Sequence, residues 1–247
     1  MDMLGLLAFF VVGAVGGFFG ATVGGGGMLV IPYLVFAGLP IEVAIATARF
    51  GDIGFAGMSA WKFSQAKQIM WKYVRPLAIL SLAGALIGTV ILLSTGKEDL
   101  KTVAAILLLV LLPFVLLNKK TGIVRREVSN ASKALGSVVY FVLEAVTGFF
   151  AAGTGPLKYY TLMLGFGLTL TEAVATQMIP YLLLATMTTG VFAVLGLIDY
   201  AAGVVLILGS IAGGYLGARF AMAMSAVWLK RLFAGMVLIA VIKLLFF

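Results

Sequence analysis

Residues 20–32 read GATVGGGGMLVIP, and four consecutive glycines, Gly24 to Gly27, interrupt an otherwise apolar stretch. A helix in lipid satisfies its own backbone hydrogen bonds, whereas four glycines in a row favour a break that exposes backbone amides. Such a break is tolerated at membrane depth only where it is buried in protein or lines an aqueous cavity. Secondary transporters use broken helices of this kind to place half-helix N-termini at anion sites. The stretch therefore predicts a membrane carrier.

The composition is that of an integral membrane protein. Hydrophobic residues make up 63% of the 247 residues and charged residues 11%, against about 45–50% and about 25% in soluble domains. Apolar runs near the ~20 residues that span hydrocarbon recur throughout, so we expect one transmembrane domain over residues 1–247. The first run lacks a preceding basic region and is expected to remain as a helix. The chain has no Cys and no His, and we predict no cofactor, metal site or catalytic site.

The two halves of the chain resemble each other. Ala46-Thr47 recurs as Ala175-Thr176, 129 positions later, and this register holds from Leu39 to Leu100. A constant register over such a distance indicates a duplication. We predict repeat 1 at residues 1–118, a linker at 119–133 and repeat 2 at 134–247. Further residues that match in this register are Ile69 with Ile198, Ser81 with Ser210, Gly84 with Gly213, and Gly88 with Gly217.

Each repeat is predicted to be all-helical, with three crossing helices and one broken re-entrant hairpin. The piece from Met28 to Phe36 is too short to span a membrane, so we expect it to enter and return. The predicted segments of repeat 1 are 3–22, 28–62 (broken at 38–40), 73–94 and 100–118. Those of repeat 2 are 134–152, 156–194 (broken near 165–167), 199–220 and 228–246.

Loop charges predict the orientation of the repeats. The loop at 62–75 carries Lys62, Lys67, Lys72 and Arg75, whereas its counterpart at 195–200 carries only Asp199. Basic loops remain cytoplasmic, so equivalent loops face opposite sides and the repeats are inverted. The basic linker at 119–133 is then cytoplasmic. We expect a multi-pass protein of a prokaryotic inner membrane, in contact with lipid. Topology explains the net charge of +8 better than a nucleic-acid partner does.

Polar residues inside the apolar segments are the candidate site, because intramembrane charge is costly and usually functional. Helix N-termini and free amides attract anions, and an Arg guanidinium adds bidentate recognition of an oxyanion. The predicted pocket therefore binds a small anion. Its predicted binding residues are Gly24, Gly25, Gly26, Gly27, Thr47, Arg49, Gly153, Thr154, Gly155, Thr176 and Gln177. The candidates for ion coupling are Asp52 and Glu144.

Each charged candidate has a second interpretation. Arg49 and Asp52 are three residues apart on one helix and could simply neutralise each other. Lys158, beside the second break, could extend to the membrane interface. Glu144 could carry a proton or hydrogen-bond a neighbour.

The glycine cluster with its following proline, Gly24 to Pro32, resembles the signature of the TauE/SafE sulfite exporter family. The corresponding sequence in the second half, Gly153-Thr154-Gly155-Pro156, and the two Ala-Thr pairs resemble it as well. The resemblance covers the whole chain. It implies export, or in some members uptake, of sulfite, sulfonates or related sulfur oxyanions. The chain departs from the family pattern after Thr47, where Ala48-Arg49 replaces a small polar residue, so the resemblance does not fix the anion.

We therefore expect a secondary transporter, not an enzyme, that exports sulfite or an organosulfonate by alternating access. The membrane potential drives a dianion out of a cell that is negative inside, so export needs no coupled ion. Uptake would need a coupled cation or proton. The alternatives are a cation or metal permease, which would need clustered intramembrane carboxylates, and another small-anion channel. A homodimer is an open alternative to a monomer.

Overall fold

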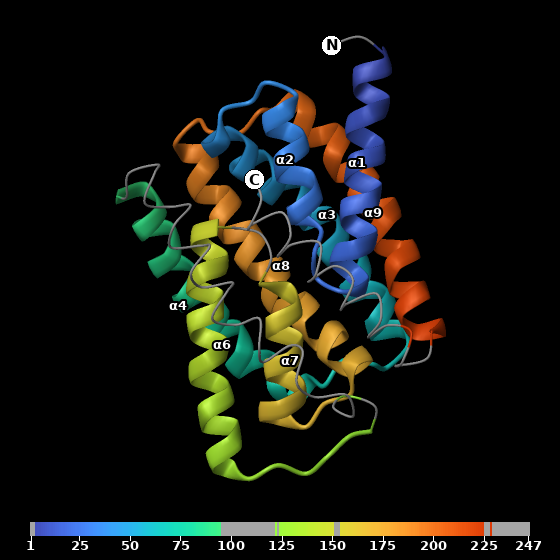
Figure 1. The fold of residues 1–247 in the computed structure, drawn as a ribbon, viewed down its shortest axis with the longest axis vertical. Helices are drawn as coiled ribbons and strands as arrows, with labels where there is room; N and C mark the ends of the chain where they lie inside the picture. Colours follow the sequence, from blue (N-terminus) through green and yellow to red (C-terminus); the bar gives the residue numbers. More distant parts are fainter. Residues whose placement is uncertain (1–2, 95–121, 123, 151–153, 225–227, 229–247) are drawn as a thin grey trace, which may run out of the picture.

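The computed structural model describes residues 3–94, 122, 124–150, 154–224 and 228, and within these ranges the chain forms eight α-helices (Figure 1). The all-helical prediction is confirmed, and each predicted helix in these ranges is present with its ends shifted by about one turn or less. The predicted helices at 100–118 and 228–246 lie outside the described residues, apart from Trp228. The helices are α1 (Met3–Thr22), α2 (Gly27–Phe36), α3 (Ile41–Gln65), α4 (Trp71–Ser94), α6 (Asn130–Phe150), α7 (Gly155–Phe166), α8 (Leu170–Val194) and α9 (Tyr200–Ala223).

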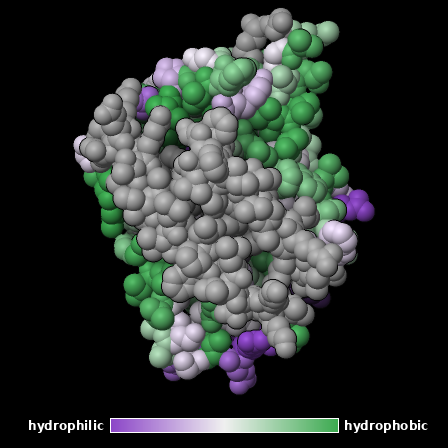
Figure 2. All heavy atoms as spheres, viewed as in Figure 1, coloured by the Kyte–Doolittle hydropathy of each residue, from purple (hydrophilic) through white to green (hydrophobic). Residues whose placement is uncertain are grey.

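Four of these helices are long and apolar enough to cross a membrane: Met3–Thr22, Trp71–Leu92, Leu170–Val194 and Tyr200–Ala223. Helices α3 and α6 are of similar length, with 25 and 21 residues, but carry charged side chains along their middle. The structure buries those charges, so they face protein and not lipid. Figure 2 shows hydrophobic side chains along the flanks of the molecule and hydrophilic ones mostly toward its ends.

Helix packing is reciprocal between the two halves. Helix α1 packs on α9 and α6 packs on α4, while α3 packs on α9 and α8 packs on α4. In the sequence register α1 corresponds to α6, α3 to α8 and α4 to α9. Each half thus supplies the fourth helix that covers the first and third helices of the other half. Helices α3 and α8 meet between these pairs.

Glycines allow the close approach of the paired helices. A Cβ added at Gly84 of α4 would lie 2.7 Å from the carbonyl oxygen of Phe141 in α6. A Cβ added at Gly217 of α9 would lie 2.6 Å from the carbonyl oxygen of Phe18 in α1. Small residues at helix interfaces are common in membrane proteins because they let two helix backbones approach closely.

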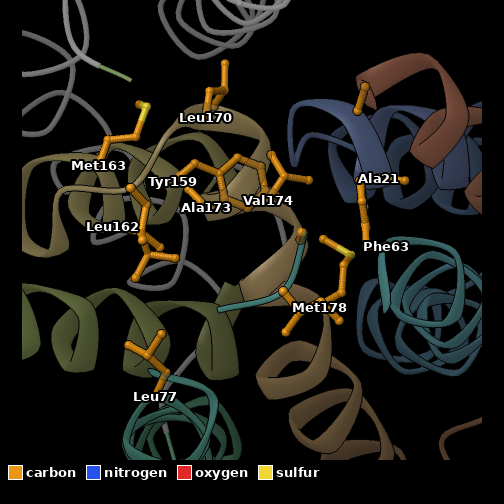
Figure 3. Close-up of a cluster of buried hydrophobic side chains, with 14 of the residues drawn as sticks. Ala21, Phe63, Leu77, Tyr159, Leu162, Met163, Leu170, Ala173, Val174 and Met178 are labelled. Carbon is orange, nitrogen blue, oxygen red and sulfur yellow. The ribbon is translucent and has the colours of Figure 1, made fainter. Parts of the chain in front are cut away.

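The short helices of the two hairpins, α2 and α7, pack in different clusters of buried apolar side chains, and each cluster also contains residues from the long helix of the other hairpin. The α7–α8 hairpin contributes Leu162, Met163 and Leu170 to a cluster that also contains Phe63 of α3 and Leu77 of α4 (Figure 3). The α2–α3 hairpin belongs to a second cluster, which includes Leu34, Ile45, Phe192 and Leu206. The two hairpin turns lie at opposite ends of the molecule (Figure 1).

Candidate functional site

The two glycine breaks touch each other in the interior. Helix α1 ends at Thr22 and α2 begins at Gly27, while α6 ends at Phe150 and α7 begins at Gly155. Between the first pair, Gly24 has a φ of +79°, a conformation that favours glycine. A Cβ added at Gly24 would lie 2.8 Å from the Cα of Gly155. The backbones of the two breaks are therefore in direct contact, and neither position has room for a side chain.

Both short helices start at this contact without a side-chain cap. Gly26 precedes α2 and Thr154 precedes α7, and neither makes a side-chain capping hydrogen bond. Uncapped helix starts carry partial positive charge and directed N–H donors. Two such starts in one place form an electropositive patch of backbone.

A small pocket, with a cavity volume of about 30 Å³, opens between the breaks. Residues from both halves line it, and the lining includes the charged side chains Asp52 and Lys158. The lining residues are Gly20, Gly24, Gly26, Gly27, Asp52, Phe55, Thr147, Thr154, Gly155, Lys158, Tyr159, Gln177, Met178 and Tyr181.

Lys158 belongs to a buried chain of polar contacts. Its Nζ lies 3.2 Å from Oε2 of Glu144, and both side chains are almost completely buried. The other carboxylate oxygen, Oε1, accepts a hydrogen bond of 2.8 Å from Nε2 of Gln177. The Gln177 carbonyl in turn accepts one of 2.7 Å from the hydroxyl of Tyr140. Lys158 therefore does not extend to the membrane interface, and Glu144 is held by two donors.

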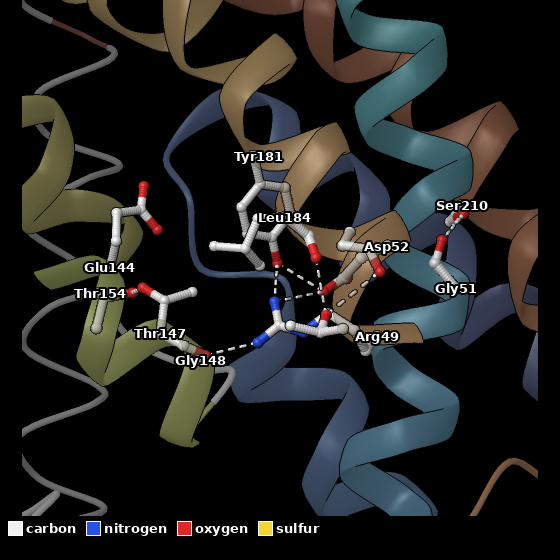
Figure 4. A network of polar contacts seen from close by, with 12 residues as sticks. Arg49, Gly51, Asp52, Glu144, Thr147, Gly148, Thr154, Tyr181, Leu184 and Ser210 are labelled. Carbon is white, nitrogen blue, oxygen red and sulfur yellow. Dashed lines mark hydrogen bonds and ion pairs between the residues drawn. The ribbon is translucent and has the colours of Figure 1, made fainter. Parts of the chain in front are cut away.

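Arg49 belongs to a second ion pair (Figure 4). Its Nη1 lies 3.6 Å from Oδ2 of Asp52 and donates a hydrogen bond of 3.0 Å to the hydroxyl of Tyr181. That hydroxyl donates to Asp52 at 2.6 Å, and Nη2 of Arg49 donates to the carbonyl oxygen of Thr147 at 2.6 Å. Arg49 is thus engaged by Asp52, Tyr181 and the α6 backbone, although its buried Nε has no hydrogen-bond partner among the described residues.

The aromatic ring of Tyr181 lies between the two ion pairs. The Lys158 Nζ is 5.0 Å from the ring centroid, and the Arg49 Cζ is 5.7 Å from it. Each cation has one carboxylate partner, so the four buried charges balance when all are ionised. The hydroxyls of Thr147 and Thr154, 2.6 Å apart, tie the end of α6 to the start of α7 beside these pairs.

The structure brings part of the predicted site together. The pocket lining contains Gly24, Gly26, Gly27, Thr154, Gly155 and Gln177, together with the coupling candidate Asp52. Gly153 lies outside the described residues. The predicted residues that do not line the pocket are Gly25, Thr47, Arg49, Thr176 and the coupling candidate Glu144.

Thr47 and Thr176 make a matched pair of contacts elsewhere. The hydroxyl of Thr47 accepts a hydrogen bond of 3.0 Å from the backbone N–H of Asp199, just before α9. The hydroxyl of Thr176 accepts one of the same length from the N–H of Met70, just before α4. Met70 and Asp199 are themselves equivalent in the repeat register. Each Ala-Thr pair thus holds a loop of the other half.

Several site residues were absent from the sequence prediction. Lys158 was noticed but left out of the binding set, because its sequence position alone could not distinguish burial from an interfacial location. Tyr181 had a usable signal, since it lies 129 positions after Asp52, which it contacts. Tyr140, Thr147 and Tyr159 had none, because helix hydropathy does not indicate which polar side chain faces the pocket.

Comparisons with known proteins agree with this architecture. The family model described as "Sulfite exporter TauE/SafE" matches residues 9–244. A probable membrane transporter protein, ORF9, from Sinorhizobium sp is 28% identical over 245 residues, covering 97% of this chain and 92% of the relative. A probable membrane transporter protein from Haemophilus influenzae is 28% identical over 222 residues, covering 90% of this chain and 86% of the relative.

A third relative, the probable membrane transporter protein YdhB of Bacillus subtilis, is 26% identical over 249 residues and covers 96% of this chain and all of the relative. No solved structure matches the chain. The family model covers nearly the whole chain, and the relatives are named as transporters. The protein is therefore a multi-pass membrane transporter that belongs to the TauE/SafE sulfite exporter family.

Proposed function

We propose that the protein is a secondary transporter that carries a small sulfur oxyanion, sulfite or an organosulfonate, through the pocket between the two glycine breaks. Transport proceeds by alternating access, with the two halves rocking about the pocket, and the physiological direction is export across the inner membrane. The observation that carries the proposal is the meeting of two uncapped helix N-termini with Lys158 and Gln177 in one buried pocket.

The chemistry of the lining suits an anion. An ammonium group, a side-chain amide, the Thr154 hydroxyl and two helix starts offer N–H and O–H donors from several directions. Such donors replace the water shell of an oxyanion when the site is closed to solvent. We assign the direct ionic contact to Lys158, because Arg49 does not line the pocket. In this proposal Arg49 holds Asp52 and Tyr181 in place.

A binding experiment tests this assignment. Purified protein is titrated with sulfite, sulfate, thiosulfate and taurine, first unmodified and then as Lys158→Met. Loss of a charge-assisted hydrogen bond weakens binding by roughly 1.5–3 kcal/mol, about 10- to 150-fold. The matched control is Lys72→Met, since Lys72 is exposed at the start of α4. Unchanged affinity in a folded Lys158→Met protein contradicts the assignment.

We further propose that the two halves are inverted in the membrane. The support is the loop-charge difference, together with the reciprocal helix packing and the opposite ends at which the hairpin turns lie. The chain has no cysteine, so single cysteines report sidedness directly. Ala66 and Leu195 are exposed and equivalent in the two halves. In cells, Ala66→Cys should be protected from an impermeant thiol reagent that labels Leu195→Cys, and labelling of both from one side rules out inversion.

A cation permease is the second candidate, because Asp52 lines the pocket. It is the weaker one, since Asp52 and Glu144 each face a buried cation, at 3.6 Å and 3.2 Å respectively. In the described part of the chain no group of three or more acidic side chains could hold a metal ion. Binding of a divalent cation, but of no anion, would favour this candidate.

A further inference from the structure

The carboxylate of Glu144 is held in the way that a bound oxyanion would be held. Lys158 Nζ contacts one of its oxygens at 3.2 Å, and Gln177 Nε2 donates to the other at 2.8 Å. The bond from Tyr140 to the Gln177 carbonyl turns the amide N–H₂ toward Glu144. Two donors of different type therefore converge on one carboxylate.

The same two donors also face the pocket. Lys158 and Gln177 line it, whereas Glu144 lies behind them in α6 with no exposed surface. An anion entering the pocket would need these donors, so it competes with Glu144 for them. The carboxylate and the substrate are alternative partners of one ammonium and one amide.

Charge balance decides how the competition is resolved. The buried cluster of Arg49, Lys158, Asp52 and Glu144 is neutral when all four are ionised. Adding an anion to a neutral, buried site leaves uncompensated charge, which is expensive in a low-dielectric interior. A proton on Glu144 removes one negative charge and frees Lys158 for the anion. Proton binding and anion binding then support each other.

The groups around Glu144 single it out over Asp52. Helix α7 presents Lys158 and Tyr159, and α8 presents Gln177 and Tyr181. Helix α6 itself presents Tyr140, and α4 approaches at Gly84, without a charge. Asp52, in contrast, is held by Arg49 and by the Tyr181 hydroxyl, and Arg49 does not line the pocket. Protonating Asp52 would free the guanidinium of Arg49, which does not line the pocket and so would not contact the anion.

We propose that Glu144 is the proton-coupling residue of this transporter, and that its ionised carboxylate occupies, on Lys158 and Gln177, the place that the substrate anion takes once Glu144 is protonated. One proton is then bound with each anion. The net negative charge carried across the membrane with each dianion therefore falls from two to one. The site is neutral when it returns without substrate. This inference rests on the proposed function, since it needs an anion in the pocket, and it replaces the expectation of export without a coupled ion.

Proton uptake on binding is the direct test. Thiosulfate is the probe, because it remains a dianion near neutral pH, whereas sulfite titrates there itself. Thiosulfate is added to the purified protein in weakly buffered solution with a pH indicator. We expect about one proton taken up per anion bound, and an affinity that falls about tenfold per pH unit once Glu144 is ionised.

Two variants locate the proton. Glu144→Gln should bind thiosulfate with no proton uptake and with an affinity independent of pH. Asp52→Asn is the matched control: its affinity can change, but it should keep the uptake of one proton per anion. Continued uptake by Glu144→Gln would place the proton on another group, such as Asp52 or Lys158, and overturn the inference, as would loss of uptake in Asp52→Asn.

The outcomes separate the inference from the proposed function. Binding of thiosulfate to the unmodified protein without proton uptake rejects proton coupling and leaves anion transport intact. Absence of binding of sulfite, sulfate, thiosulfate and taurine at every pH rejects the proposed function itself. The measurement on the unmodified protein decides between these even where Glu144→Gln does not fold.

Discussion

The two broken hairpins have the same shape and different chemistry. Helices α3 and α8 have 25 residues each, and α2 and α7 have 10 and 12. Yet the positions of Arg49 and Asp52 in α3 are occupied in α8 by Met178 and Tyr181. Lys158 of α7 corresponds to an apolar residue, Leu29, in α2. In our proposal the duplication provides a symmetric scaffold, and divergence within it provides the anion site.

The turns of the hairpins differ as well. At the α7–α8 turn, the linker lies against the chain: the N–H of Arg126 donates to the Gly167 carbonyl at 2.9 Å, and the N–H of Leu170 donates to the Gly122 carbonyl at 2.9 Å. At the α2–α3 turn Phe36 is 92% exposed, and a Cβ added at Gly38 would meet no atom within 4 Å. Only the α7–α8 turn is covered by another segment of the described chain.

The largest expected effect of a single substitution is at the ion pair that only α3 carries. Arg49→Gln leaves the carboxylate of Asp52 buried without its cation, and breaking a buried pair in this way costs about 3–5 kcal/mol. We expect a loss of this size in the free energy of unfolding, measured by denaturant titration in detergent micelles. The double variant Arg49→Gln, Asp52→Asn should recover most of it. If Arg49→Gln is as stable as the unmodified protein but binds the anion more weakly, Arg49 contacts the anion directly.

The next largest effect is expected at Gly24, and it should exceed the effect at Gly38, the other glycine with a positive φ near the first hairpin. Gly24→Ala combines a strained backbone with contacts of under 3 Å to Gly155, which together should cost roughly 2–5 kcal/mol. Gly38→Ala, at a φ of +96° but in open space, should cost only the backbone strain, about 1–3 kcal/mol. Thermal unfolding in detergent compares them. Equal losses would mean that the contact between the breaks is unimportant for stability.

Most of the fold followed from the sequence because membrane helices must satisfy their own backbone. The glycines at 24–27, the turns near Pro40 and Gly167, and the register between Thr47 and Thr176 therefore predicted the helices correctly. The partners of the polar side chains did not follow. Arg49 faces Thr147 and Tyr181 from other helices, and Thr47 bonds a loop of the other half. Such contacts depend on how helices rotate against one another, which hydropathy does not determine.

A smaller effect is expected from the two equivalent threonine contacts. Thr47→Val and Thr176→Val each remove one hydrogen bond to a loop N–H, at a cost of about 0.5–1.5 kcal/mol if the N–H finds another partner. Because the contacts are equivalent, the two losses should be similar and should add in the double variant. Neither should change anion affinity, since neither residue lines the pocket. If only one of the two variants loses anion binding, that threonine contributes to the anion site.

The smallest effect on stability is expected at Arg125, in the linker segment that packs on the α7–α8 turn. Arg125 lies 3.1 Å from Glu172, but its side chain is 52% exposed, so solvent screens the pair. Glu172 also forms a capping box with Thr169, which holds the start of α8 independently of Arg125. Arg125→Gln should therefore lower the free energy of unfolding by only about 0.2–1 kcal/mol, and less at high salt. Glu172→Gln keeps the same shape at the cap and serves as the control. If Arg125→Gln alters the transport rate while stability is unchanged, the linker controls the movement of this hairpin, and the covered turn is a moving part of the transporter.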